Sequence, residues 1–112
     1  MESKKMSSRK TSTPIEAIPG IFRTTLAYNK ETMLCHFQLK KGSGIPLHNH
    51  VAVQIGYVIS GKLKFKKEDG SSFIADSGTG YVFESEEQHG AEALEDSEVI
   101  ECFAPMRPEY AD

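Results

Sequence analysis

The chain has 112 residues, a net charge of −3 and 38% apolar residues, which suits one globular domain. It contains no run of about 20 apolar residues, so we expect no membrane association, and the small negative charge gives no indication of a nucleic-acid partner. The start, MESKKMSSRK, lacks the apolar segment of a secretory signal, so we expect a cytoplasmic protein. In that compartment Cys35 and Cys102 are expected to be free thiols.

Residues 1–13 are rich in Ser, Thr, Lys and Arg and contain almost no apolar side chains. Such a segment buries too little surface to offset the entropy lost on ordering, so we expect a disordered tail. The folded domain is expected to cover residues 14–112.

From Pro14 onward, the sequence is typical of short strands separated by Gly-rich turns. Residues 33–40 and 62–66 alternate apolar and polar side chains, which indicates half-buried strands. Residues 51–60 are apolar on both faces, which predicts a strand that lines a barrel on one face and packs under a sheet or partner subunit on the other. Further strands are expected at residues 73–75, 81–83 and 99–103, with turns at 76–80 and 88–90. No helical stripe is visible, and the pattern favours an all-β sandwich or barrel.

Two histidines, His48 and His50, stand two residues apart in an extended segment, so their imidazoles point to the same side. Imidazole is a common ligand of first-row metals, although an H-x-H pair alone is weak evidence. Gln54 follows at an even spacing and therefore shares that side. Burial of its amide in an apolar strand would be costly unless it binds a metal or is hydrogen-bonded across the sheet. His36 lies opposite the apolar face of its strand and is expected at the surface or in an interface.

These residues resemble the first cupin motif, G-x5-H-x-H-x3,4-E-x6-G, which runs here from Gly42 to Gly61 with Gln54 in the position of Glu. The second motif, G-x5-P-x-G-x2-H-x3-N, is matched more loosely from Gly70, and its histidine corresponds to His89. The resemblance implies a cupin double-stranded β-helix, or jelly-roll barrel. It also implies one divalent metal ion, Mn, Fe, Co, Ni or Zn. The implied ligands are His48, His50, Gln54 and His89.

The segment from Val99 to Tyr110 resembles the ending of small cupins of the KdgF type, which ketonise unsaturated uronates in pectin and alginate breakdown. This resemblance implies that Glu101 is an acid/base residue, although that group usually has Asp there. It further implies that Arg107 binds a substrate carboxylate. Phe103, and Tyr57 in the Tyr-Val-Ile-Ser-Gly stretch, would contact the substrate. Apart from the resemblance, Arg107 could equally form a salt bridge with a nearby acid.

The sequence therefore favours a metal-dependent enzyme that acts on a small anionic substrate such as an unsaturated sugar acid, by ketonisation or isomerisation. The alternatives are a polyketide cyclase or dioxygenase of the same fold, a non-catalytic sugar-binding or sensing module, and a protein whose histidines have no metal role. We also expect a homodimer, because Ile55, Tyr57 and Ile59 need cover that a chain this short does not readily supply.

Overall fold

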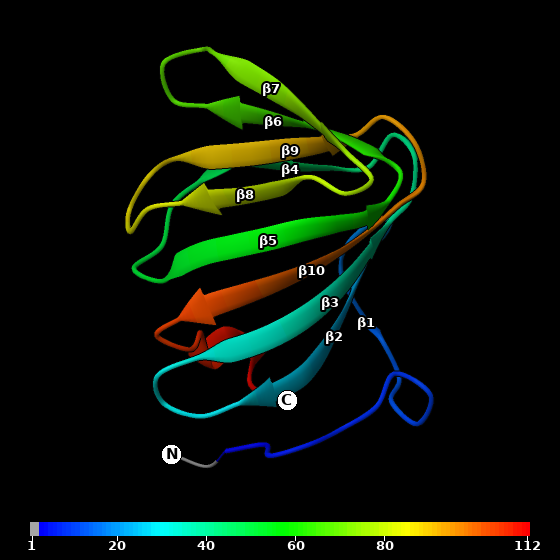
Figure 1. The fold of residues 1–112 in the computed structure, drawn as a ribbon, viewed down its shortest axis with the longest axis vertical. Coiled ribbons are helices and arrows are strands. Elements are labelled where there is room, and N and C mark those ends of the chain that lie inside the picture. The colour runs from blue at the N-terminus through cyan, green and yellow to red at the C-terminus, as the bar shows by residue number, and fades with distance from the viewer. Residues whose placement is uncertain (1–2) are drawn as a thin grey trace.

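The computed structural model describes residues 3–112, which form two antiparallel sheets that face each other (Figure 1). The larger sheet contains, in spatial order, β1 (Ile15–Ile18), β2 (Ile21–Tyr28), β3 (Met33–Leu39), β10 (Ser97–Ala104), β5 (Val53–Ser60) and β8 (Gly80–Phe83). The smaller sheet contains β4 (Gly44–His48), β9 (His89–Ala93), β6 (Lys62–Lys67) and β7 (Ser72–Asp76). A 3-10 turn, η1 (Pro108–Tyr110), follows β10. The predicted all-β fold is confirmed.

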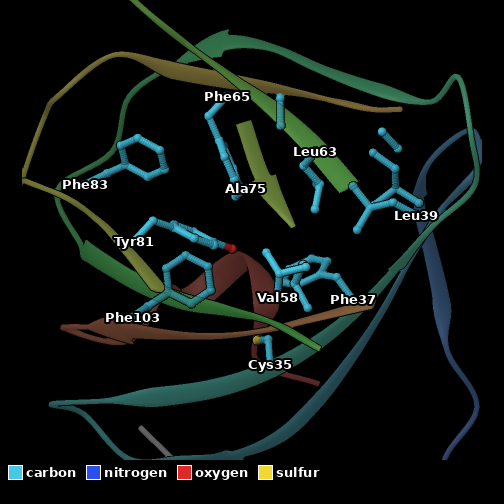
Figure 2. Packing of buried hydrophobic residues seen from close by; sticks show 14 of the residues in the cluster. Cys35, Phe37, Leu39, Val58, Leu63, Phe65, Ala75, Tyr81, Phe83 and Phe103 are labelled. Atoms are coloured by element: carbon cyan, nitrogen blue, oxygen red, sulfur yellow. The ribbon is translucent and has the colours of Figure 1, made fainter. Parts of the chain in front are cut away.

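The core lies between the two sheets and is built from the alternating strands. In β6, Leu63 and Phe65 are buried, whereas the lysines between them point outward. Because successive side chains of a strand point to opposite faces, each half-apolar strand supplies one row of core residues. Figure 2 shows ten labelled members of this core: Cys35, Phe37, Leu39, Val58, Leu63, Phe65, Ala75, Tyr81, Phe83 and Phe103.

The two faces of strand β5 differ in burial within the described part of this chain, so of the two predicted covers for its outer face, a second sheet is excluded there and a partner subunit stays a prediction. Gln54 and Val58 are buried and face the barrel, but Ile55, Tyr57 and Ile59 are exposed on the outer face. Within residues 3–112, no second sheet covers that face. The apolar character of the outer row therefore needs an explanation other than the core of this chain.

Strand β9 forms where the sequence suggested a turn at residues 88–90. Its sequence, HGAEA, has little strand propensity, but its backbone pairs with β4 on one side and β6 on the other. A side chain at Gly90 would bring its Cβ within 2.8 Å of the Ile45 carbonyl oxygen. The missing side chain at Gly90 therefore allows close contact with β4, and pairing on both sides overrides the weak propensity.

Lys4 and Ser7 contact β2, in a segment for which the sequence favoured a disordered tail over residues 1–13. The backbones of Lys4 and Tyr28 exchange hydrogen bonds of 3.0 and 2.9 Å, and the Ser7 hydroxyl donates to the Leu26 carbonyl at 2.6 Å. The expectation for Met1 and Glu2 lies outside the described residues. Polar and backbone contacts therefore attach a segment that has almost no apolar side chains.

His36 is buried on the outer face of β3, so the surface position, one of the two expected alternatives, is wrong. Its Nε2 lies 2.9 Å from Oε2 of Glu98, and Arg9 of the N-terminal segment contacts the same carboxylate at 3.3 Å. Burial and the nearby Arg9 lower the pKa of His36. The outer face of β3 and β10 thus carries a polar cluster in which only His36 is buried.

Both cysteines are free thiols, as expected. No helical segment among residues 3–112 combines the length and the apolar character needed to cross a membrane.

Candidate metal centre and adjoining cavity

Three histidines meet at one end of the barrel, between β4, β5 and β9. His48 ends β4 and is paired with His89, the first residue of β9, while His50 lies in the loop before β5. One ring nitrogen from each histidine lies within 4.8 Å of those of the other two. These three side chains could therefore hold a metal ion.

The other ring nitrogens fix the tautomers. Nδ1 of His48 donates to the Pro46 carbonyl at 3.0 Å, and Nδ1 of His50 donates to the Ala52 carbonyl at 2.7 Å. Nδ1 of His89 donates to the carbonyl of residue 87 at 2.8 Å. Because a carbonyl oxygen only accepts, each Nδ1 carries the hydrogen, and Nε2 keeps its lone pair in the neutral ring.

The environment keeps two of these rings neutral. Burial lowers the pKa of His89 to about 4. Burial, followed by the positive charge of Arg107, also lowers the pKa of His50. Neutral imidazole is the form that binds metals, so the electrostatics suit a ligand cluster.

Gln54 faces the same cluster from β5. Its Oε1 lies 3.1 Å from Nε2 of His50 and 3.2 Å from Nε2 of His89, while its Nε2 donates to Oε2 of Glu101 at 2.6 Å. The bond to Glu101 fixes the amide orientation, so Oε1 points toward the histidines. With Nδ1 protonated, lone pairs on Oε1 and on two ring nitrogens face one another without a hydrogen between them. A cation would relieve that repulsion, so the donor set fits a metal ion.

Glu101 lies beside this cluster, on the inner face of β10. Its Oε2 accepts from both Gln54 and the Tyr81 hydroxyl, the latter at 2.5 Å. Burial raises the pKa of Glu101, against the opposing effects of these two hydrogen bonds and of the Arg107 charge. The carboxyl group is therefore both hydrogen-bonded and shifted in pKa, which is common for carboxyl groups at active sites.

Arg107 follows β10 and is largely buried. Its guanidinium carbon lies 5.2 Å from the centre of the Phe103 ring and 4.2 Å from that of Tyr110, and one terminal nitrogen is 3.5 Å from Glu109. Its Nε is buried without a hydrogen-bond partner among the described residues. The sequence left a salt bridge and a place in the site as alternatives for Arg107. The structure shows both, because Arg107 contacts Glu109 and also lines the cavity described next.

A cavity of about 70 Å³ connects these groups. Its polar and aromatic lining consists of His48, Gln54, Tyr81, His89, Glu101, Phe103, Arg107, Tyr110, Phe37 and Phe65. Six of the residues singled out from the sequence thus line one cavity, and His50 adjoins it through the histidine cluster.

Tyr57 does not join the site, which corrects its assignment to substrate binding. It is 48% exposed on the outer face of β5, because its position has the opposite parity to that of Gln54. Sequence reasoning also missed Tyr81 and Tyr110. Tyr81 alternates inward with Phe83 like an ordinary core residue, so only the fold reveals its polar partner.

Comparisons with known proteins agree with this architecture. The profile of the family described as "Cupin domain" matches residues 35–103. The pectin degradation protein KdgF of Dickeya dadantii (strain 3937) is 31% identical over 101 residues, which cover 88% of this chain and 91% of that protein. The match thus extends over nearly the whole length of both proteins.

Two solved structures are similar over almost all of the chain. KdgF from Halomonas sp. has a TM-score of 0.86 at 30% identity, covering 93% of this chain and 96% of its own. An RmlC-like cupin from Shewanella frigidimarina NCIMB 400 has a TM-score of 0.91 at 23% identity, covering 98% and 99%, which is a likeness of fold. The chain therefore belongs to the cupin family, among the small cupins related to KdgF.

Proposed function

We propose that this protein is a metal-dependent isomerase that ketonises a small unsaturated sugar acid. The observation that carries the proposal is the lining of one cavity by two metal-ligand histidine candidates, the buried carboxyl group of Glu101 and the guanidinium of Arg107. The relationship to KdgF, named for pectin degradation, supports a uronate as the substrate class.

The proposed metal ligands are His48, His50, His89 and Gln54. All four are neutral, so a divalent ion would keep its full charge and would draw electron density from an enol or carbonyl oxygen of the substrate. The protein contributes by fixing the three imidazole tautomers and by turning the Gln54 carbonyl oxygen toward them. Mn, Fe, Co, Ni and Zn all suit such a mixed nitrogen and oxygen set.

The chain's own residues can complete the reaction. Arg107 would bind the substrate carboxylate through its planar guanidinium, and Phe103 would form a wall of the pocket. When the hemiacetal ring of the unsaturated sugar acid opens, the bond between C1 and the ring oxygen breaks, the C1 hydroxyl becomes the aldehyde, and its proton passes to the ring oxygen, which is then an enol hydroxyl. In ketonisation, a carbon of the double bond gains a proton and this hydroxyl loses one, so the overall composition is unchanged. Glu101, whose pKa is raised by burial, would give its proton to carbon and then take the hydroxyl proton, returning to its starting state.

The test uses untagged protein, stripped of metal and reloaded with each of the five ions. A pectate lyase product, the 4,5-unsaturated galacturonate monosaccharide, serves as substrate, and loss of ultraviolet absorbance from its conjugated double bond is followed. We expect loaded protein to exceed the uncatalysed rate, with Glu101→Gln reducing kcat by at least about 100-fold. A rate equal to the uncatalysed one with every ion would reject the proposal, and tight binding without turnover would favour a sugar-binding module.

We also propose that two copies pair through the outer face of β5. Ile55 is the Cα partner of Val82 in β8 and of Cys102 in β10, so apolar side chains cross three strands in one row. Ile55 is 55% exposed and Val82 is 50% exposed. A second copy of this chain would cover the row with an equally apolar surface.

A further inference from the structure

Three neighbouring strands place Glu101, Gly56 and Tyr81 in one row. Glu101 of β10 is the Cα partner of Gly56 in β5, and Gly56 is the Cα partner of Tyr81 in β8. Residues in one such row point to the same face, here the barrel interior. The middle position has no side chain, so the outer two can meet across it.

Tyr81 fills the space above Gly56. A Cβ at position 56 would lie only 2.4 Å from both Cζ and the hydroxyl oxygen of Tyr81. The ring lies inside the barrel, near Phe65 and Phe83 (Figure 2), at centroid distances of 4.5 and 5.8 Å. Packing therefore holds the phenol in a slot that exists only because residue 56 is glycine.

The hydroxyl of Tyr81 and the amide of Gln54 both donate to the same oxygen, Oε2 of Glu101. Two donors on one oxygen fix the rotation of the carboxyl group. Within residues 3–112, no hydrogen bond to Oε1 is formed. Burial and the neighbouring carboxyl group raise the pKa of Tyr81 well above its usual value, so the phenol stays protonated and remains a donor.

We propose that Tyr81 is a positioning residue for the acid/base carboxyl group of Glu101. By donating to Oε2 from the slot above Gly56, the phenol leaves Oε1 as the oxygen that exchanges a proton with the substrate. This inference rests on the function proposed above. Tyr81 moves no proton itself, and its effect on catalysis comes from orientation, which proton transfer requires.

The experiment compares Tyr81→Phe with Tyr57→Phe in the metal-loaded full chain. Each change removes one phenol oxygen, but that of Tyr57 is on the outer face. We expect Tyr81→Phe to lower kcat about ten-fold and to leave KM within about two-fold, with the metal content unchanged. Tyr57→Phe should behave as wild type. A wild-type kcat for Tyr81→Phe, or a change confined to KM, would overturn the inference.

Crystal structures of both variants give a readout that does not depend on turnover. In Tyr81→Phe, the Glu101 carboxyl group should rotate or occupy more than one conformer, while in Tyr57→Phe it should stay in place. An unmoved carboxyl group in Tyr81→Phe would contradict the positioning role. If the wild-type protein fails to turn over uronates, the proposed function falls, and these structures still decide whether Tyr81 orients Glu101.

Discussion

Gln54 and Glu101 are joined by a 2.6 Å hydrogen bond in which the amide nitrogen donates to the carboxyl group. The same amide presents its oxygen to His50 and His89. One side chain therefore connects the histidine cluster to the buried carboxyl group. A metal site needs a lone pair from this side chain, whereas Glu101 needs a hydrogen-bond donor, and the amide supplies both. A carboxylate at position 54, which is usual in cupins, could serve the metal but could not donate to Glu101.

Replacing Gln54 with Glu should strengthen metal binding and remove the hydrogen bond donated to Glu101, so the two contributions of Gln54 can be measured separately. A carboxylate binds a cation more strongly, so loss of metal to EDTA should become slower. The two adjacent carboxyl groups would then compete for one proton, so we expect kcat to fall by about ten-fold or more. Metal competition and steady-state kinetics measure the two effects. Gln54→Ala is the companion variant and should weaken metal binding; unchanged affinity would remove Gln54 from the ligand set.

Arg107→Lys should raise KM and leave kcat largely intact. Lysine keeps the positive charge but loses the planar pair of donors that suits a carboxylate, so we expect KM for a uronate to rise about ten-fold. Steady-state kinetics measure this change. Glu109→Gln removes the exposed partner of Arg107 and serves as the control, with no increase in KM. An increase in KM of similar size in both variants would contradict direct binding by Arg107.

Ile55→Asp should convert the proposed homodimer to a monomer, because it places a charge at the centre of the apolar row on β10, β5 and β8. Ile74→Asp on β7 is the matched control, since Ile74 is an isoleucine of nearly equal exposure, 53%, on the other sheet. Sedimentation at micromolar concentration should give dimers for the wild type and for Ile74→Asp. A monomeric wild type would disprove the interface.

Cys35 should react slowly with thiol reagents while the protein is folded. Burial raises the pKa of this thiol to about 11, and the thiolate is the reactive form. At pH 8, only about one thiol in a thousand is then ionised, and the fraction grows as pH rises toward 11. The variant Cys102→Ser isolates the signal of Cys35. Ellman's reagent should label it slowly at pH 8 and promptly after unfolding; rapid labelling of the folded variant would contradict the burial.

The sequence predicted the parts of the fold that depend on local pattern. The alternation in β3 and β6 identified their inner faces, and the spacing of the first motif placed His50 and Gln54 beside the same cluster, although His50 lies in the loop before β5 and not in the strand. The first motif is informative because its fixed spacings fall on the end of β4, the next loop and the inner face of β5. Where the alternation within a strand determines which face a side chain points to, the sequence alone was enough to predict it.

The remaining features depend on residues that are distant in sequence. Strand β9 forms because β4 and β6 flank it, although its own residues resemble a turn. The sequence pattern predicts only that Tyr81 is a core aromatic residue. Its contact with Glu101 depends on the pairing of both residues with Gly56 across three strands. Tyr57 was misassigned because its role was taken from the resemblance alone. Its position in β5 has the opposite parity to Gln54, so its side chain points away from the barrel.

The anchoring of the three histidines has a consequence for how mutations should be tolerated. Each Nδ1 is held by a main-chain carbonyl two residues away, so no side chain is needed to orient the rings. Substitutions at the residues that provide these carbonyls therefore leave the anchoring groups in place. Gln54, by contrast, depends on another side chain for its orientation. A saturation mutagenesis map scored by metal content should thus show tolerance around the histidines and sensitivity at Gln54 and Glu101.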